Sequence, residues 1–240
     1  MNTAISWDAK AAQSKMSETV IRDWAAKFPV MALEKDGKPT GSYRWLARVS
    51  FPHLFHPTKM EGSPGQPTYS AKALMIPGYD IGLLTEAVKA TRAEKWPKGL
   101  PGHWKTPFKK QDDKAENLTG YLPGGVFMSL SANSVNSKTG AALAPPKIYD
   151  LKQSLITNEA DIYPGVWGFF VGRPYNYDAP GNCGTKFSLD MFIKFMDDTP
   201  LASGQRTSVA DAMADLNLDT VIQGQTSGAA SSYDDLDLLS

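Results

Sequence analysis

The sequence predicts a mainly β domain that carries one or two helices and ends in an acidic tail. Twenty glycines and 17 prolines in 240 residues interrupt the chain too often for a bundle of long helices. Between these breaks, apolar and polar residues alternate over short stretches, which is typical of half-buried strands. Hydrophobic residues make up 42% of the chain, enough to form a substantial core, so a disordered protein is excluded.

The first expected elements lie before residue 52. Residues 17–28 have a helical pattern, with Ser17 as the N-cap and apolar residues at a spacing of four. The turn signal at 35–38 precedes a clean alternation over 44–51, which predicts the first strand. We predict that the inward side of this strand carries Trp45, Ala47, Val49 and Phe51. The helix is expected to pack on the body of the protein.

Four more strands and one helix are expected further along the chain. The pattern predicts strands over 68–76, 124–132, 166–173 and 186–195, and a helix over 80–96. A Gly/Pro/Asn-rich connection over 175–184 would join the last two strands as a long hairpin. Five short strands with a helix between two of them suit a five-stranded Greek-key barrel of the OB type. Other small barrels or β-sandwiches fit the pattern almost as well.

The chain divides into three parts by composition. We predict an N-terminal helical extension over 1–40, a β-barrel domain over 41–204 and a flexible acidic C-terminal tail over 205–240. Within the tail, 208–218 has the pattern of a short helix and 224–232 has the composition of a linker. Its end alternates acids with leucines, which favours a short docking motif over an inert solubilising tail.

The formal net charge of zero conceals two regions of opposite sign. Residues 201–240 hold six acids and one base and so carry a net charge of −5. Residues 1–200 hold 24 bases and 19 acids, so the body carries +5, together with every Trp and Phe of the chain. An acidic tail on a basic body is expected to compete with other polyanions for the body's surface.

Basic residues concentrate between Lys89 and Lys114, where eight Lys and Arg residues accompany only three acids. Trp96, Trp104 and Phe108 are interleaved with them. Cations follow phosphates and aromatic rings stack on unpaired bases, so this mixture favours binding of single-stranded nucleic acid. The alternative is a solvated helix face followed by a loop whose aromatic residues fill the core.

The sequence offers little for catalysis or metal binding. Cys183 is the one cysteine, which rules out an internal disulfide and favours a reducing compartment. The pair His53 and His56 lacks the spacing of a helical metal motif, and adjacent acids at 112–113 or 197–198 would point to opposite faces of a strand. We expect no enzymatic activity, no cofactor and no metal. With no signal peptide or membrane span in the pattern, we also expect a cytoplasmic protein.

Five segments carry a resemblance to a known family: RVSFPHLFHP (48–57), PTYSAKALMIP (67–77), AEKWPKGLPGHWKTPFKKQDD (93–113), YPGVWGFFVGRPYNYD (163–178) and DDTPLASG (197–204). In this order they resemble the phage-encoded OB-fold single-stranded DNA-binding proteins found in caudoviruses, over roughly residues 45–204. The end of the chain, 233–240, is similar to the acidic tails of phage and bacterial proteins of this kind, although it finishes in Leu-Leu-Ser rather than an aromatic residue.

The resemblance implies a protein that coats single-stranded DNA without strong sequence preference during phage DNA replication, recombination or repair, in the cytoplasm of the host cell. It implies no catalysis. It also implies that the tail competes with DNA and docks replication or recombination proteins. A non-enzymatic phage structural or protein-interaction β-domain is the alternative function.

Strand alternation and the basic segment predict the individual contact residues. For phosphate contacts we predict Arg44, Arg48, Lys72, Lys105, Lys109, Lys110, Arg173 and Lys186. For stacking on bases we predict Tyr69, Trp104, Phe108, Trp167, Tyr175 and Tyr177, with the barrel core as the alternative location for such rings. For partner docking we predict Tyr233, Asp234, Asp235, Leu236, Asp237, Leu238 and Leu239.

Overall fold

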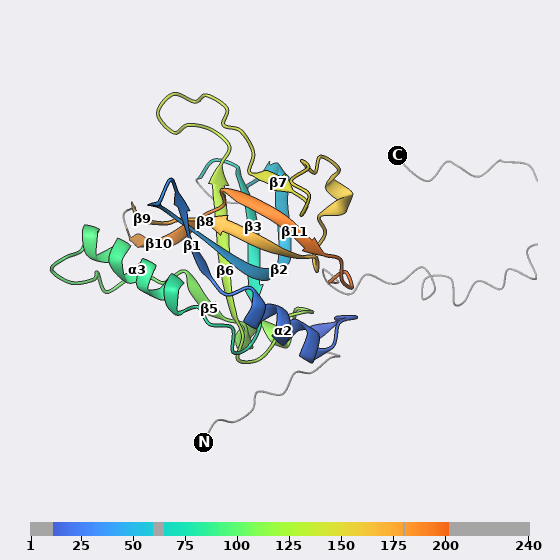
Figure 1. Cartoon of the computed structure of the whole chain (residues 1–240). Coiled ribbons are helices and arrows are strands. Elements are labelled where there is room, and N and C mark those ends of the chain that lie inside the picture. Colours follow the sequence, from blue (N-terminus) through green and yellow to red (C-terminus); the bar gives the residue numbers. More distant parts are fainter. Residues whose placement is uncertain (1–11, 60–64, 180, 202–240) are drawn as a thin grey trace, which may run out of the picture. The chain divides into compact units, whose positions relative to one another are not determined.

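The computed structural model describes residues 12–59, 65–179 and 181–201. Within these ranges, eleven strands belong to one mixed β-sheet, accompanied by helices α2 (Glu18–Lys27), α3 (Gly82–Lys95) and α4 (Asp112–Ala115) (Figure 1). The predicted mainly β class is confirmed. The predicted tail helix, the linker and the docking residues from Tyr233 to Leu239 lie outside the described residues.

The eleven strands are β1 (Met31–Lys35), β2 (Lys38–Thr58), β3 (Thr68–Met75), β4 (Trp104–Lys105), β5 (Phe108–Lys110), β6 (Val126–Asn133), β7 (Lys147–Tyr149), β8 (Trp167–Gly172), β9 (Pro174–Ala179), β10 (Asn182–Ser188) and β11 (Met191–Met196). The predicted strands over 44–51, 68–76, 124–132 and 166–173 fall in β2, β3, β6 and β8. The predicted helix over 80–96 is α3. The predicted number of five strands is too low. The strands β1, β4, β5, β7 and β9 were missed because they lack a long alternation of apolar and polar residues.

The main path through the sheet runs β4-β10-β6-β3-β2-β8-β11-β7. The chain passes from β10 to β11 through only Leu189 and Asp190. The Leu189 N–H donates to the Ser131 carbonyl of β6, whereas the Asp190 N–H donates to the Val171 carbonyl of β8. The single strand predicted over 186–195 is therefore wrong: the segment bends at these two residues and changes its pairing partner from β6 to β8.

The core lies on the inward sides of β2, β3, β6, β8, β10 and β11. Trp45 of β2 stacks on Phe170 of β8, with the ring centroids 6.1 Å apart, and meets Phe187 of β10 edge-on at 5.5 Å. Ala47 and Val49 are buried beside Trp45, as the alternation predicts. Cys183 is buried and unpaired, so it serves as a small apolar core residue.

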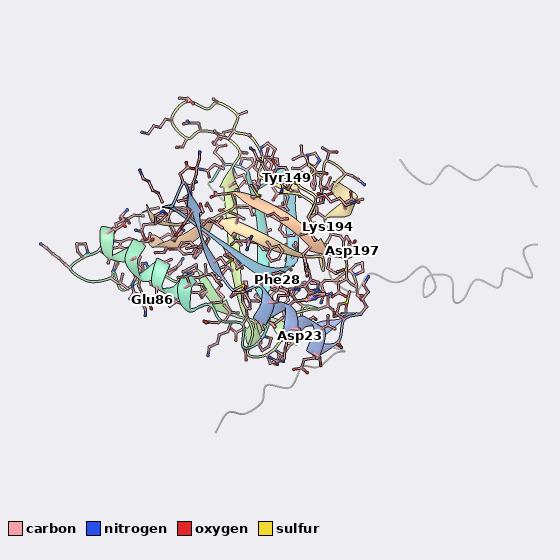
Figure 2. The ribbon with its side chains drawn as sticks, in the orientation of Figure 1. Asp23, Phe28, Glu86, Tyr149, Lys194 and Asp197 are labelled. Carbon is pink, nitrogen blue, oxygen red and sulfur yellow. The ribbon has the colours of Figure 1, made fainter. Side chains whose placement is uncertain are left out.

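Helix α2 covers the outward side of β8 and β11. The Ser17 hydroxyl accepts a hydrogen bond from the Val20 N–H, which confirms the predicted N-cap. Trp24 and Phe28 both place their rings edge-on to Phe195 of β11, at 5.0 and 5.3 Å between centroids. Figure 2 shows Phe28 just beyond the end of α2. The helix therefore packs on the body, as expected.

A β-hairpin formed by β1 and the start of β2 follows α2. Its turn contains Asp36 and Gly37, both with positive φ, at 53° and 72°. An Asp-Gly pair readily adopts this conformation, which matches the right-handed twist of the strands. The residues before 41, predicted to be a helical extension, thus include a hairpin as well as a helix.

A buried ion pair joins segments near both ends of the described residues to strand β2. Arg48 of β2 and Asp198 lie 3.3 Å apart, with side chains 3% and 0% exposed. The Arg48 guanidinium also donates to the backbone carbonyls of Ala12, Gly165 and Thr199. Because all of these partners are internal, Arg48 has a structural role in the fold, and its contact with DNA phosphate stays a prediction that the structure does not support.

Asp198 is hydrogen-bonded by groups from distant parts of the chain. It accepts from the Ser14 hydroxyl at 2.6 Å and from the Trp167 indole N–H at 2.8 Å. Burial raises the pKa of Asp198, but these hydrogen bonds and the charge of Arg48 outweigh burial, so the pKa lies below its ordinary value. Asp198 is therefore charged in the folded protein at neutral pH.

Candidate nucleic-acid interface

The hairpin of β9 and β10 has two chemically different faces. Asn176 and Thr185 point to one face, where the Asn176 side chain donates to the Thr91 carbonyl of α3. Helix α3 lies along this hairpin in Figure 1, and Lys95 of α3 pairs with Asp178 of β9. Since strand residues alternate between faces, the intervening residues point away from α3.

The face turned away from α3 carries Lys186 between two tyrosines. Lys186 stands directly across the hairpin from Tyr175, and its ammonium lies 4.6 Å from the centroid of the Tyr177 ring. Tyr177 lies opposite Gly184, where a Cβ atom would come within 2.8 Å of the tyrosine hydroxyl. The missing side chain at Gly184 thus lets the Tyr177 ring lie close against β10.

Within the basic segment, residues 104–110 form two short strands, β4 and β5, that pair with β10 and β6. Trp104 and Lys105 of β4 pair with β10, and Phe108 to Lys110 of β5 pair with β6. The alternation puts Trp104 and Phe108 against the core and leaves Lys105 and Lys109 exposed. The Trp104 indole N–H is buried, but the rings of Trp104 and Phe108 are only partly buried against the core. Their stacking on DNA bases stays a prediction.

Two other predicted stacking residues are buried. Tyr69 is on the inward side of β3, and Trp167 is enclosed between Arg48 and Trp24 on the outward side of β8. The Trp167 N–H is used by Asp198. Both rings are enclosed by the protein, so the structure does not support their stacking on DNA bases, which stays a prediction.

Five lysines form a continuous basic surface, which we call the lysine surface: Lys72, Lys105, Lys109, Lys114 and Lys186. The pKa of Lys72 is lowered by burial and by the charges of Lys114 and Lys109. The pKa of Lys186 is lowered by burial and by the charges of Lys109 and Lys105. Lys109 therefore links the two halves of the surface.

The lysine surface holds like charges close together, because neighbouring lysines lower the pKa of both Lys72 and Lys186. Lys105 is bound by the neutral side chain of Asn182, 2.9 Å away. Between Lys72 and β10 the sheet presents small polar residues, Ser129 and Ser131 of β6. Such a surface is favourable for a flexible polyanion, whose phosphates would relieve the repulsion between the lysines.

The remaining predicted cations lie around or away from this surface. Lys110 is exposed at the end of β5. Arg173, at the start of the β9–β10 hairpin, makes an exposed ion pair of 3.3 Å with Asp190. Arg44 lies where β2 pairs with β8, with its guanidinium 5.5 Å from the centroid of the Phe169 ring. Arg44 is therefore not joined to the lysine surface.

Two residues of this region were missed by the sequence analysis. Lys114 belongs to α4, which is too short to leave a periodic signal. Phe51 was predicted to be a core residue but is 37% exposed, with Lys72 above its ring. The dipeptide Phe51-Pro52 is the available signal, because proline removes a ladder N–H and often accompanies a break in strand pairing.

Within the described ranges, no group of three or more His, Cys, Asp or Glu side chains could hold a metal ion. No described helix is long and apolar enough to cross a membrane.

A β-sheet that presents clustered cations beside exposed aromatic rings is typical of proteins that bind single-stranded nucleic acid without reading its sequence. The family model described as "Enterobacter phage Enc34, ssDNA-binding protein" matches residues 44–221, and the chain belongs to this family. This confirms the resemblance drawn from the sequence. A search of curated protein sequences finds no significant match.

Solved structures of phage proteins share the fold. The single-stranded DNA-binding protein of bacteriophage Enc34 in complex with ssDNA is 21% identical, with a TM-score of 0.53 over 72% of this chain and 98% of that chain. The single-stranded DNA-binding protein gp2.5 of bacteriophage T7 is 14% identical, with a TM-score of 0.50 over 70% of this chain and 96% of that chain.

Proposed function

We propose that this chain coats single-stranded DNA, without strong sequence preference and without catalysis, during phage DNA replication, recombination or repair in the host cytoplasm. Membership of the Enc34 family supports this function. The observation that carries it in the structure is the lysine surface, where five cations and two tyrosines share one region. Phosphates would bind the lysines while bases stack on exposed rings, which tolerates any base.

Within this proposal, Lys72, Lys105, Lys109, Lys110, Lys114 and Lys186 contact phosphates, with Arg173 at the edge of the site. Tyr175 and Tyr177 stack on bases. Tyr175 is 37% exposed, and Tyr177 is held beside Lys186. An amphipathic tyrosine can offer an apolar face to a base while its hydroxyl stays in water.

We also propose that 41–204 forms a closed barrel of the OB type. Strand β2 pairs with β3 on one side and β8 on the other, and β3 pairs with β6. The bent segment 182–196 runs parallel to β6 and then antiparallel to β8, which would complete a ring of five strands. A solution NMR structure that lacks either of these last two pairings would overturn the barrel.

The acidic tail over 205–240 is proposed to compete with DNA for the lysine surface and, when displaced, to dock proteins of the same replication system. Its net negative charge supports competition. Leu201, the last described residue, is anchored beside Tyr121 and Phe127 and lines a hollow with Phe51. Leu201 therefore lies near Phe51, whose ring the Lys72 ammonium covers.

The binding proposal is tested by fluorescence anisotropy of a labelled 30-mer oligonucleotide at low and moderate salt. We expect binding that weakens steeply with salt and prefers the single strand to a duplex competitor. Absence of binding would favour the alternative of a structural or protein-interaction domain.

The tail proposal needs a second protein that lacks residues 232–240. We expect this truncated protein to bind the oligonucleotide more tightly than the full chain, most clearly at low salt, because three of the six competing acids are gone. Equal affinity of the truncated protein and the full chain would contradict competition between the tail and DNA. Partner docking would then be the tail's remaining proposed role.

A further inference from the structure

Phe51 is an aromatic residue held outward by an unfavourable backbone conformation. Its φ is +48°, in the left-handed region that bulky residues rarely adopt. The pairing of β2 with β3 changes register between Ser50 and His53, on either side of Phe51 and Pro52. The bulge interrupts the alternation that would otherwise turn the ring into the core, where Val49 and Leu54 are buried.

Such an arrangement is costly in two ways. The left-handed conformation of a non-glycine residue costs free energy, and an exposed phenyl ring forgoes burial. Strained residues that persist in a fold cluster at binding sites, so this outlier motivates a functional hypothesis.

The surroundings of Phe51 indicate what it would bind. The Lys72 ammonium lies 4.1 Å from the ring centroid, and Lys72 is one end of the lysine surface. Beside the ring, Ser50 and Tyr121 line a small hollow that Phe51 also lines, but their hydroxyls are buried and hydrogen-bonded to each other, 3.3 Å apart. An exposed ring face beside a cation matches the base and the phosphate of a nucleotide.

We propose that Phe51 is a base-stacking residue and that Lys72 exchanges places with the DNA base. Without DNA, the ammonium of Lys72 covers the ring of Phe51. When DNA binds, a phosphate draws the ammonium toward itself and a base takes its place on the ring. This inference rests on the proposed function and adds a stacking position at a residue that the strand alternation predicted to lie in the core.

The test compares Phe51→Gly with the matched variant Met196→Ala, whose parent side chain is 38% exposed on β11. Glycine removes the ring but accepts the left-handed backbone, so the thermal midpoint should not fall. We expect affinity for the 30-mer to drop about tenfold, within the range measured for loss of one stacked base. Met196→Ala should leave the affinity unchanged.

The salt dependence separates stacking from phosphate binding. Phe51→Gly should keep the wild-type slope of log Kd against log salt, because no cation is removed, and Phe51→Trp should restore the affinity. If the wild type binds and Phe51→Gly binds equally well, or loses stability instead of affinity, the inference is overturned while the proposed function stands. If the wild type fails to bind, the proposed function falls with it.

Discussion

At the scale of single residues, the same side-chain type takes opposite roles according to the face on which its strand presents it. Lys186 stands exposed between two tyrosines, whereas Arg48, equally well placed by simple alternation, is buried with Asp198. Alternation identifies which residues share a face. It does not reveal that residues 12–16 and 198–201 cover the outward face of β2 at Arg48.

The buried ion pair predicts a large and specific loss of stability. Replacing Arg48 with Met leaves Asp198 charged without its partner and several carbonyls without a donor, which should cost about 3–5 kcal/mol of the free energy of unfolding. Urea unfolding measures this loss. The control is Arg173→Met, which removes the exposed pair with Asp190 and should cost less than about 1 kcal/mol. Equal costs for the two variants would contradict a structural role for Arg48.

At the scale of elements, patterns long enough to repeat were predictable from the sequence. Helices α2 and α3 and the strands β2, β3, β6 and β8 are all at least six residues long. Strands β4 and β5 hold only two and three residues, so their signal is hidden in a basic, aromatic stretch. The bend at Leu189 depends on hydrogen bonds to β6 and β8, which no local pattern records.

The candidate site was predictable in part for the same reason. Lysines on the basic segment are exposed where the composition indicated, and the aromatic residues Trp104 and Phe108 between them alternate toward the core, where they are partly buried. In a strand this short, the alternation of residues does not reveal which face of the strand is exposed to solvent. The bulge at Phe51 reverses the expected face at a residue that alternation alone would bury.

Gly184 tests the packing of β10 against β4 and β9. A Cβ atom there would lie 2.4 Å from the Lys105 carbonyl oxygen and 2.8 Å from the Tyr177 hydroxyl. We expect Gly184→Ala to lower the free energy of unfolding by about 1–3 kcal/mol, because the strands must separate, and to weaken DNA binding by displacing Tyr177. Both effects are measured by urea unfolding and anisotropy.

The control for this variant is Gly102→Ala, since no atom lies within 4 Å of a Cβ at Gly102. It should retain both stability and affinity. A Gly184→Ala protein that also retains both would show that Tyr177 and β4 do not need this close approach.

At the scale of the whole molecule, acid should release the segments that Asp198 holds together. Its pKa is lower in the folded than in the unfolded protein, so its stabilisation is present above the unfolded value of about 4 and is lost as the pH falls through the folded pKa. Asp198→Asn should therefore be less stable than the wild type at pH 7. The difference should shrink at pH 3, where urea unfolding of both proteins checks it. A difference independent of pH would contradict this role.

The central claim is that DNA binds on the lysine surface, and a comparison of two double variants tests it most directly. Lys72→Ala/Lys186→Ala removes both ends of the surface, whereas Lys38→Ala/Lys152→Ala removes the same charge from exposed positions elsewhere. Anisotropy titrations of the 30-mer should show weaker binding for the first variant, with a slope of log Kd against log salt reduced by about 1.4 for two lost contacts. The second variant should match the wild type in slope. Equal affinities and slopes for both variants would contradict the claim.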